Sequence, residues 1–153
     1  MDADCLIKLT KSGLKEPICR FTEVIIPRTV QREVVEAGRI KGQPDADLVD
    51  QNIQDGLITV AEECSPHHST GDQALIDVFT EGRYTVIATD DAKLIRSLRS
   101  AGIPFTVPAL LIHGQYEKGE IDRTTALQRL EALSAFISDE EYTVVKLLLE
   151  ERA

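Results

Sequence analysis

The first residues that could do chemistry are two aspartates at the start of the chain. Asp2 and Asp4 are separated by one small residue and precede an apolar pair. In an extended segment, alternate side chains share one face, so both carboxylates would point the same way and could bind a cation. The alternative is that they cap a helix that begins near Cys5, by accepting hydrogen bonds from its first amides.

Glu33 is a second candidate, because it falls on the inward side of a predicted helix. With 3.6 residues per turn, it lies near the same face as Val30 and Ala37 in the helix expected after Pro27. Burying a carboxylate without a partner costs several kcal/mol, so this position favours a nearby cation. The alternative is a glutamate at the edge of the apolar stripe whose carboxylate reaches solvent.

Three further aspartates stand at the boundaries of predicted elements. Asp72 follows Gly71 at the start of a helix, where an acid also stabilises the helix dipole. Asp90 and Asp91 follow the apolar run that ends at Ala88, and ligands of parallel sheets bind beyond the C-terminal ends of strands. Capping of the next helix explains one of these two aspartates more easily than both.

If the fold brings these acids together, the chemistry is that of divalent cations. Four or five neighbouring carboxylates cannot all stay ionised without positive charge, and ligands that are all oxygen favour Mg²⁺ or Mn²⁺ over zinc. Other chemistries lack support, because the sequence contains no nucleophile elbow, Walker loop, dinucleotide fingerprint or zinc-protease motif. We expect no catalytic role for the histidines or cysteines, which are His67, His68, His113, Cys5, Cys19 and Cys64.

The composition bounds the partners that such a site could have. The chain has 153 residues, with 17 Lys and Arg against 26 Asp and Glu, and the formal net charge of −9 argues against broad electrostatic capture of nucleic acid. A local binding site for nucleic acid is still compatible with this charge. The acidic start and the lack of any run of about 20 apolar residues predict a cytoplasmic protein without a membrane span or a leader.

The elements that would position these acids alternate between strand and helix. Apolar runs typical of buried strands occur at 24–26, 57–60, 85–88 and 105–107, and helical patterns lie between them. This order predicts an α/β fold with a mostly parallel sheet covered by helices on both faces. The helices before the third strand are expected at 28–38 and 45–54, and later ones end near Gly82 and Gly102.

The chain becomes helical after Pro108. Asp122 is expected to cap a helix over 123–133, and Ser138 with Glu141 forms a capping-box pattern at the start of the last helix. We interpret 1–120 as the main domain and 121–153 as a helical C-terminal extension of that domain. The apolar residues at 109–112 and in the last helix exceed what one small sheet needs, so a homodimer is expected.

The ordered acidic motifs resemble those of the PIN-domain nucleases. The opening segment 2–7, Ile26-Pro27 with Glu33, Gly71-Asp72, and the run 86–91 resemble the four successive motifs of that family. The resemblance spans roughly 1–111. Each motif is weak alone, and their order makes the match fairly specific. Only Met1 precedes Asp2 where the family has several apolar residues, so the first strand is expected to be truncated.

The resemblance implies a three-layer α/β/α domain that binds Mg²⁺ or Mn²⁺ and hydrolyses RNA. The implied metal-binding and catalytic carboxylates are Asp2, Glu33, Asp72 and Asp91, with Asp90 beside the last as a further ligand. Asp4 and Asp77 are secondary candidates: Asp4 or Asp90 as proton acceptor, and Asp77 as a weaker substitute for Asp72. Many members of the family are toxins of toxin–antitoxin pairs, which implies an antitoxin protein as a partner.

Basic residues follow the fourth acidic motif. Lys93, Arg96 and Arg99 are spaced three residues apart and could guide RNA along one helix face. The alternative is an ordinary solvated helix face.

Two other functions fit part of the pattern. Asp2-x-Asp4 and the Gly71-Asp72 motif superficially match the haloacid-dehalogenase phosphatases, in which the first aspartate is a covalent nucleophile. The segment before Gly71 argues against this, because the late acidic motif of those phosphatases follows a hydrophobic strand, whereas Cys64-Ser65-Pro66-His67-His68 precedes Gly71 here. A non-catalytic PIN-like module that binds RNA or a protein partner is the third interpretation.

Overall fold

The structure is a computed structural model that describes residues 1–62 and 70–151. Cys64, His67 and His68 lie outside the described residues. The elements, in order, are α1 (Ala3–Lys11), α2 (Lys15–Phe21), β1 (Val24–Pro27), α3 (Arg28–Gln31), η1 (Arg32–Glu36), α4 (Ala37–Ile40), α5 (Asp45–Gln54), β2 (Ile58–Ala61), α6 (Gly71–Glu81), β3 (Ile87–Ala88), α7 (Ala92–Ala101), β4 (Phe105–Thr106), α8 (Pro108–Glu117), α9 (Arg123–Leu133), η2 (Ser134–Phe136) and α10 (Asp139–Glu150).

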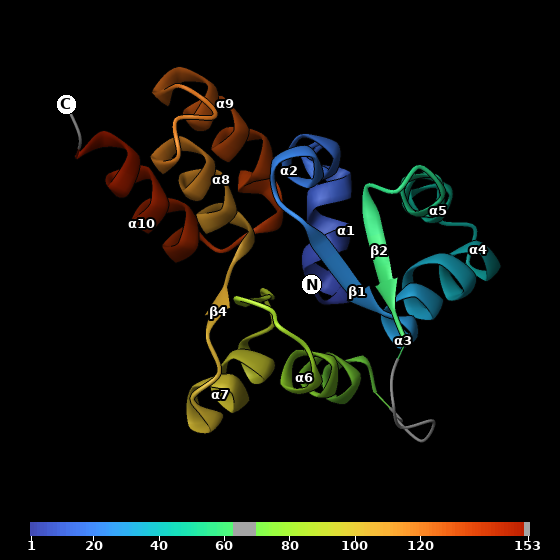
Figure 1. The fold of residues 1–153 in the computed structure, drawn as a ribbon. Coiled ribbons are helices and arrows are strands. Elements are labelled where there is room, and N and C mark those ends of the chain that lie inside the picture. Colours follow the sequence, from blue (N-terminus) through green and yellow to red (C-terminus); the bar gives the residue numbers. More distant parts are fainter. Residues whose placement is uncertain (63–69, 152–153) are drawn as a thin grey trace.

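Parallel strands and covering helices confirm the α/β expectation, with one difference in the sheet. The described strands form two parallel pairs, β1 with β2 and β3 with β4, instead of one continuous sheet. The start of the chain lies between the pairs (Figure 1): the Met1 amino group donates to the Ile25 carbonyl at 2.9 Å, and the Asp2 amide donates to the Ala88 carbonyl at 3.0 Å. These two hydrogen bonds connect the strand pairs where a central strand would pair with both.

Two helical layers pack on opposite faces of the strands. Ile87 joins a small apolar cluster with Leu75 of α6 and Leu98 of α7, whereas the next residue, Ala88, joins the main core. Neighbouring side chains in a strand point to opposite faces, so α6 and α7 cover one face and the main core fills the other. The described part of the chain is therefore a three-layer α/β/α arrangement.

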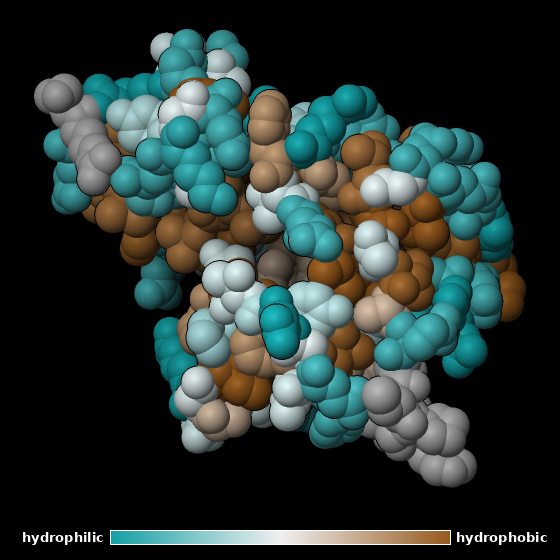
Figure 2. Space-filling view, in the orientation of Figure 1, coloured by the Kyte–Doolittle hydropathy of each residue, from teal (hydrophilic) through white to brown (hydrophobic). Residues whose placement is uncertain are grey.

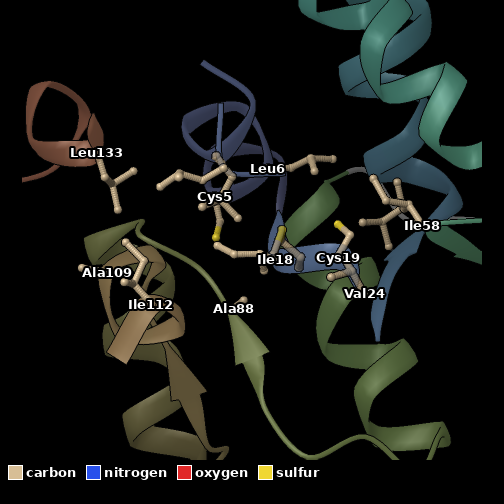
Figure 3. Close-up of a cluster of buried hydrophobic side chains, with 14 of the residues drawn as sticks. Cys5, Leu6, Ile18, Cys19, Val24, Ile58, Ala88, Ala109, Ile112 and Leu133 are labelled. Atoms are coloured by element: carbon tan, nitrogen blue, oxygen red, sulfur yellow. The ribbon is translucent and has the colours of Figure 1, made fainter. Parts of the chain in front are cut away.

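The main core links the strands to the N-terminal and C-terminal helices. Figure 3 shows side chains from α1, α2, β1, β2, β3, α8 and α9 meeting in one cluster, with Cys5 and Leu6 near its centre. Cys5 and Cys19 are both buried and free of disulfides, as expected for structural thiols. Leu133 and Leu149, from the C-terminal helices, are completely buried in the same cluster. The helices after 120 thus share a core with the strands.

Some apolar side chains remain at the surface. Figure 2 shows them across the middle of one face, between the C-terminal helices above and α6 and α7 below. Phe21, Val144 and Leu147 are each at least half exposed. Across the described ranges 1–62 and 70–151, no helix is long and apolar enough to cross a membrane.

Candidate active site

A cavity of about 160 Å³ lies where the N-terminus of α1, the α3–η1 helix, the N-terminus of α6 and the turn after β3 meet. Its lining includes all four carboxylates expected to be catalytic, together with one of the secondary candidates. The residues that line it are Asp2, Ala3, Asp4, Val30, Glu33, Gly71, Asp72 and Asp91. Acids that are up to 89 positions apart in the sequence therefore border one small space.

Asp2 is the most buried of these acids, with 4% of its surface exposed. It does not lie in an extended segment with Asp4, as alternation had suggested. It caps α1 instead, and its Oδ1 accepts a hydrogen bond of 2.9 Å from the Cys5 amide. Burial raises the pKa of Asp2 to about 6, although this hydrogen bond and another from Thr89 act in the opposite direction.

Thr89 connects the first and last acidic motifs and was missed in the sequence. Its side chain is completely buried, its hydroxyl donates to Asp2 Oδ2, and its oxygen accepts from the Asp91 amide at 3.1 Å. The hydroxyl thereby fixes the turn that follows β3 relative to the start of α1. A buried threonine between an apolar run and two aspartates was the available signal, because its hydroxyl needs partners.

Glu33 lies in a π-helical turn of the long helix that follows β1. Such turns are rare and occur frequently at functional sites, because the extra residue redirects a side chain. Its carboxylate packs against Gly71, where an added Cβ would lie only 2.6 Å from Glu33 Oε1. Partial burial raises the pKa of Glu33, and a hydrogen bond from the Gly71 amide opposes this increase.

Asp72 and Asp91 complete the acidic lining. Asp91 caps α7, with Oδ1 accepting from the Lys93 and Leu94 amides at 2.8 and 3.1 Å. Asp72 lies in the first turn of α6, whose cap is Thr70. The pKa of Asp72 is raised, first by burial and then by the negative charge of Asp91, while Lys93 lowers it. The two carboxylates are therefore close enough to repel one another.

Asp90 is oriented away from this cavity, unlike its neighbour. Lys8 lies between two carboxylates, with its Nζ 2.6 Å from Asp90 Oδ2 and 3.1 Å from Asp4 Oδ2. Glu141, from α10, interacts with Asp90 from the other side, and burial followed by this hydrogen bond raises the pKa of Glu141 to about 8. Asp90 lines a different cavity, between α7 and α10, so the structure gives no support to Asp90 as a metal ligand.

The remaining candidates are dispersed. Asp77 lies outside the acidic cavity and accepts a hydrogen bond from Gln73 at 3.1 Å. Arg99 lies over the ring of Phe105 in the cavity between α7 and α10, and Arg96 is exposed. Of the three basic candidates, Lys93 is the one whose charge acts on the acidic cavity, through Asp72. They do not form one strip along the site.

The donor set fits a hard divalent cation that keeps part of its water. The ionisable side chains that line the cavity offer only carboxylate oxygens as ligands. The pKa of Asp2, Glu33 and Asp72 is raised, and a bound cation would lower each of them. Within the described ranges, however, no three Asp, Glu, His or Cys side chains are close enough to form a finished metal cage. Mg²⁺ usually binds through few protein ligands and several waters, so an open cavity of this kind is compatible with it.

A family model described as a PIN domain matches residues 1–151. The chain belongs to the PIN-domain family. Neither the search of curated proteins nor the search of solved structures found a significant match. The PIN-domain match covers the C-terminal helices as well as the segment that carries the four acidic motifs, and PIN domains are in general nucleases that use divalent metal ions. It favours the nuclease interpretation over the phosphatase one.

Proposed function

We propose that this PIN-domain protein is an endoribonuclease that depends on Mg²⁺ or Mn²⁺. The observation that carries the proposal is the convergence of Asp2, Glu33, Asp72 and Asp91 on one cavity. Ion pairing satisfies none of these four carboxylates in the described part of the chain, whereas Asp90 and Asp4 each pair with Lys8. Unpaired acids that share a cavity raise one another's pKa, and bound cations would relieve this repulsion.

The four carboxylates would hold the metal. When bound, such an ion polarises a phosphoryl oxygen and lowers the pKa of a water molecule for in-line attack. Asp2 and Asp91 are both restrained by hydrogen bonds: Asp2 accepts from the Cys5 amide and the Thr89 hydroxyl, and Asp91 accepts from two amides through Oδ1. Their positions are thus set before substrate binds, which reduces the reorganisation needed for reaction.

Asp4 is the better candidate to accept the proton of the attacking water. It lines the same cavity, and its carboxylate is 47% exposed and held by Lys8. Asp90, the other candidate, lies on the far side of Lys8. A proton acceptor must be within hydrogen-bond reach of the reacting water, directly or through one other water.

The test compares carboxylate-to-amide variants inside and outside the cavity. Purified Asp2→Asn and Asp91→Asn are expected to lose most cleavage of single-stranded RNA in Mn²⁺, by about a hundredfold or more, the range that the loss of one essential electrostatic group produces. Asp77→Asn is the matched control, because Asp77 lies outside the cavity. If all three variants cleave like the parent, the assignment is wrong. If the parent binds RNA without cutting it, the protein is a non-catalytic binding module.

The proposal extends to a toxin of a toxin–antitoxin pair that acts in the cytoplasm as a homodimer. Its support is the family and the exposed apolar side chains Leu110, Val144 and Leu147 on α8 and α10, which are available to a protein partner. Expression of the chain is expected to arrest growth, and Asp91→Asn to abolish the arrest. Sedimentation should give twice the mass of 16.9 kDa; a monomer at micromolar concentration would contradict the dimer.

A further inference from the structure

A second cavity, of about 280 Å³, adjoins the candidate active site and shares a wall with it. The shared residue is Glu33, which lines both spaces. The second cavity lies among the C-terminal end of α1, the η1–α4 helix and the start of α5. A molecule that reaches past Glu33 from the acidic cavity would enter this space next.

Two lysines, Lys11 and Lys41, line this second cavity together with two carboxylates, those of Glu33 and Asp45. In the ranges 1–62 and 70–151, no carboxylate lies within 4 Å of Lys11 or Lys41, and both residues are exposed. Two basic residues close to them in the sequence, by contrast, form ion pairs. Lys8 is held by Asp4 and Asp90, and Arg39 is held by Asp47 and Asp50. Lys11 and Lys41 are therefore exposed cations that no neighbouring carboxylate in the described part of the chain holds.

The rest of the lining suits a nucleoside. Ile7, Val34 and Ala46 supply an apolar surface, and Gln43 and Asp45 supply hydrogen-bond donors and acceptors for a base edge or a ribose hydroxyl. Gly38 allows α5 to approach closely, because an added Cβ there would lie 3.1 Å from Ala46 Cβ. Small-molecule sites combine an apolar surface with a few polar groups in this way.

Positive charges also lie near two different acids of the site. Lys93 acts on Asp72, whereas Lys11 and Lys41 line the cavity that Glu33 shares with the acidic one. An anionic strand that contacts both Asp72 and Glu33 would thus meet a cation near each of them. In a chain of net charge −9, such local cations are what a polyanion requires.

We propose that the cavity lined by Lys11 and Lys41 is a nucleotide subsite of the same nuclease centre. The two lysines bind a backbone phosphate adjacent to the scissile one, and the neighbouring nucleoside packs on the apolar surface beside Val34. The inference rests on the proposed ribonuclease function, and it adds that the bound RNA strand extends past Glu33 into the second cavity.

The test measures the binding of a short fluorescein-labelled single-stranded RNA to the full chain. The double variant Lys11→Gln with Lys41→Gln is compared with the matched double variant Lys118→Gln with Lys146→Gln, whose lysines line neither cavity. Fluorescence anisotropy is recorded in Ca²⁺ over a salt series, with gel electrophoresis to show that the RNA stays intact. Circular dichroism melts show whether each variant is folded. If a double variant does not fold, the two corresponding single variants are measured in its place.

The expected result is binding about tenfold weaker for the Lys11/Lys41 variant and less than about twofold weaker for the control. Losing the neutralisation of one phosphate on a single strand should also reduce the salt slope by about 0.7. In Mn²⁺, KM should rise with kcat unchanged at saturating RNA, because the lost contacts act equally before and during reaction. If both double variants lose the same RNA affinity and the parent still cleaves RNA, the subsite proposal is wrong and the proposed function is unaffected. A parent that neither binds nor cleaves RNA rejects the proposed function, and the subsite with it.

Discussion

The carboxylate of Glu33 lies directly against Gly71, so that an added Cβ at residue 71 would be 2.6 Å from Oε1 and 3.1 Å from Oε2. This contact joins the helix after β1 to the start of α6, and it leaves Glu33 within the acidic cavity. Gly71 therefore has a role that depends on its lack of a side chain. The backbone of α6 can approach the carboxylate closely enough for its amide to lower the pKa of Glu33.

Gly71→Ala is expected to displace the Glu33 carboxylate and to reduce RNA cleavage by about tenfold or more, the range seen when a supporting contact of a metal ligand is lost. The control is Gly114→Ala on α8, where an added Cβ meets nothing within 4 Å. That variant should retain activity and become about 0.5–1 kcal/mol more stable, because alanine favours the helix. Cleavage assays and urea unfolding measure both effects. Full activity in Gly71→Ala would show that the contact is dispensable.

Asp2→Asn is expected to abolish cleavage while stabilising the metal-free protein. The pKa of Asp2 is raised to about 6, so the folded state holds its proton more tightly than the unfolded state does. This stabilisation is present below the ordinary pKa near 4 and is lost as the pH rises through 6. At pH 7 the folded protein therefore contains a buried, charged Asp2 carboxylate. The amide removes that charge, so the free energy of unfolding in EDTA at pH 7 should rise by about 1–3 kcal/mol.

Urea unfolding in EDTA at pH 5 and pH 7.5 checks this prediction. The parent should lose stability across that interval, and Asp2→Asn should lose less. A variant that is less stable than the parent at pH 7.5 would show that hydrogen bonds to the carboxylate outweigh its desolvation.

Metal affinity should depend on the same group. Because a ligating carboxylate must be ionised, Mn²⁺ binding competes with the proton on Asp2. The affinity is expected to rise by up to tenfold per pH unit below about 6 and to level off above 7. Calorimetry at pH 5, 6, 7 and 8 measures this, and the proton uptake or release gives an independent readout. A flat profile would exclude Asp2 as the titrating ligand.

Thr89→Val should reduce cleavage strongly because it removes the hydroxyl between Asp2 and Asp91. The buried Asp2 Oδ2 and the Asp91 amide would both lose a partner, which costs about 1–3 kcal/mol per group. Thr89→Ser keeps the hydroxyl and should recover most of the activity. Cleavage rates of the two variants, with melting temperatures as a check on folding, separate the hydroxyl's positioning role from packing of the methyl group. Equal losses in both variants would point to packing alone.

Glu141→Gln tests how α10 is attached to the domain. The pKa of Glu141 is raised to about 8, first by burial and then by its hydrogen bond with Asp90. Between its ordinary pKa near 4.5 and 8, the folded state holds a proton that the unfolded state has lost, so stability falls as the pH rises. Glutamine can still accept from the Ala109 amide and donate to Asp90. It should flatten the decrease in melting temperature between pH 5 and 8.5; an unchanged decrease would assign that pH dependence to other groups.

The sequence alone determined the features that depend on local spacing. Asp122 and Ser138 were expected to cap their helices, and they do, through hydrogen bonds of 2.7 and 3.1 Å to the Thr125 and Glu141 amides. The helices at 45–54 and 123–133 have the predicted bounds. The parallel α/β order was likewise evident, since alternating apolar runs and helical patterns are properties of neighbouring residues.

The tertiary structure decided which acids meet, because contacts between distant residues leave no local pattern. Glu141 was expected to return to Ser138 in a capping box, but its carboxylate accepts from Ala109 and contacts Asp90 instead. Asp90 and Asp91 were both expected to bind metal, yet Lys8 holds the first outside the cavity that the second lines. Packing of α1 and α10 against the turn after β3 makes that distinction, and only the folded chain brings those helices there.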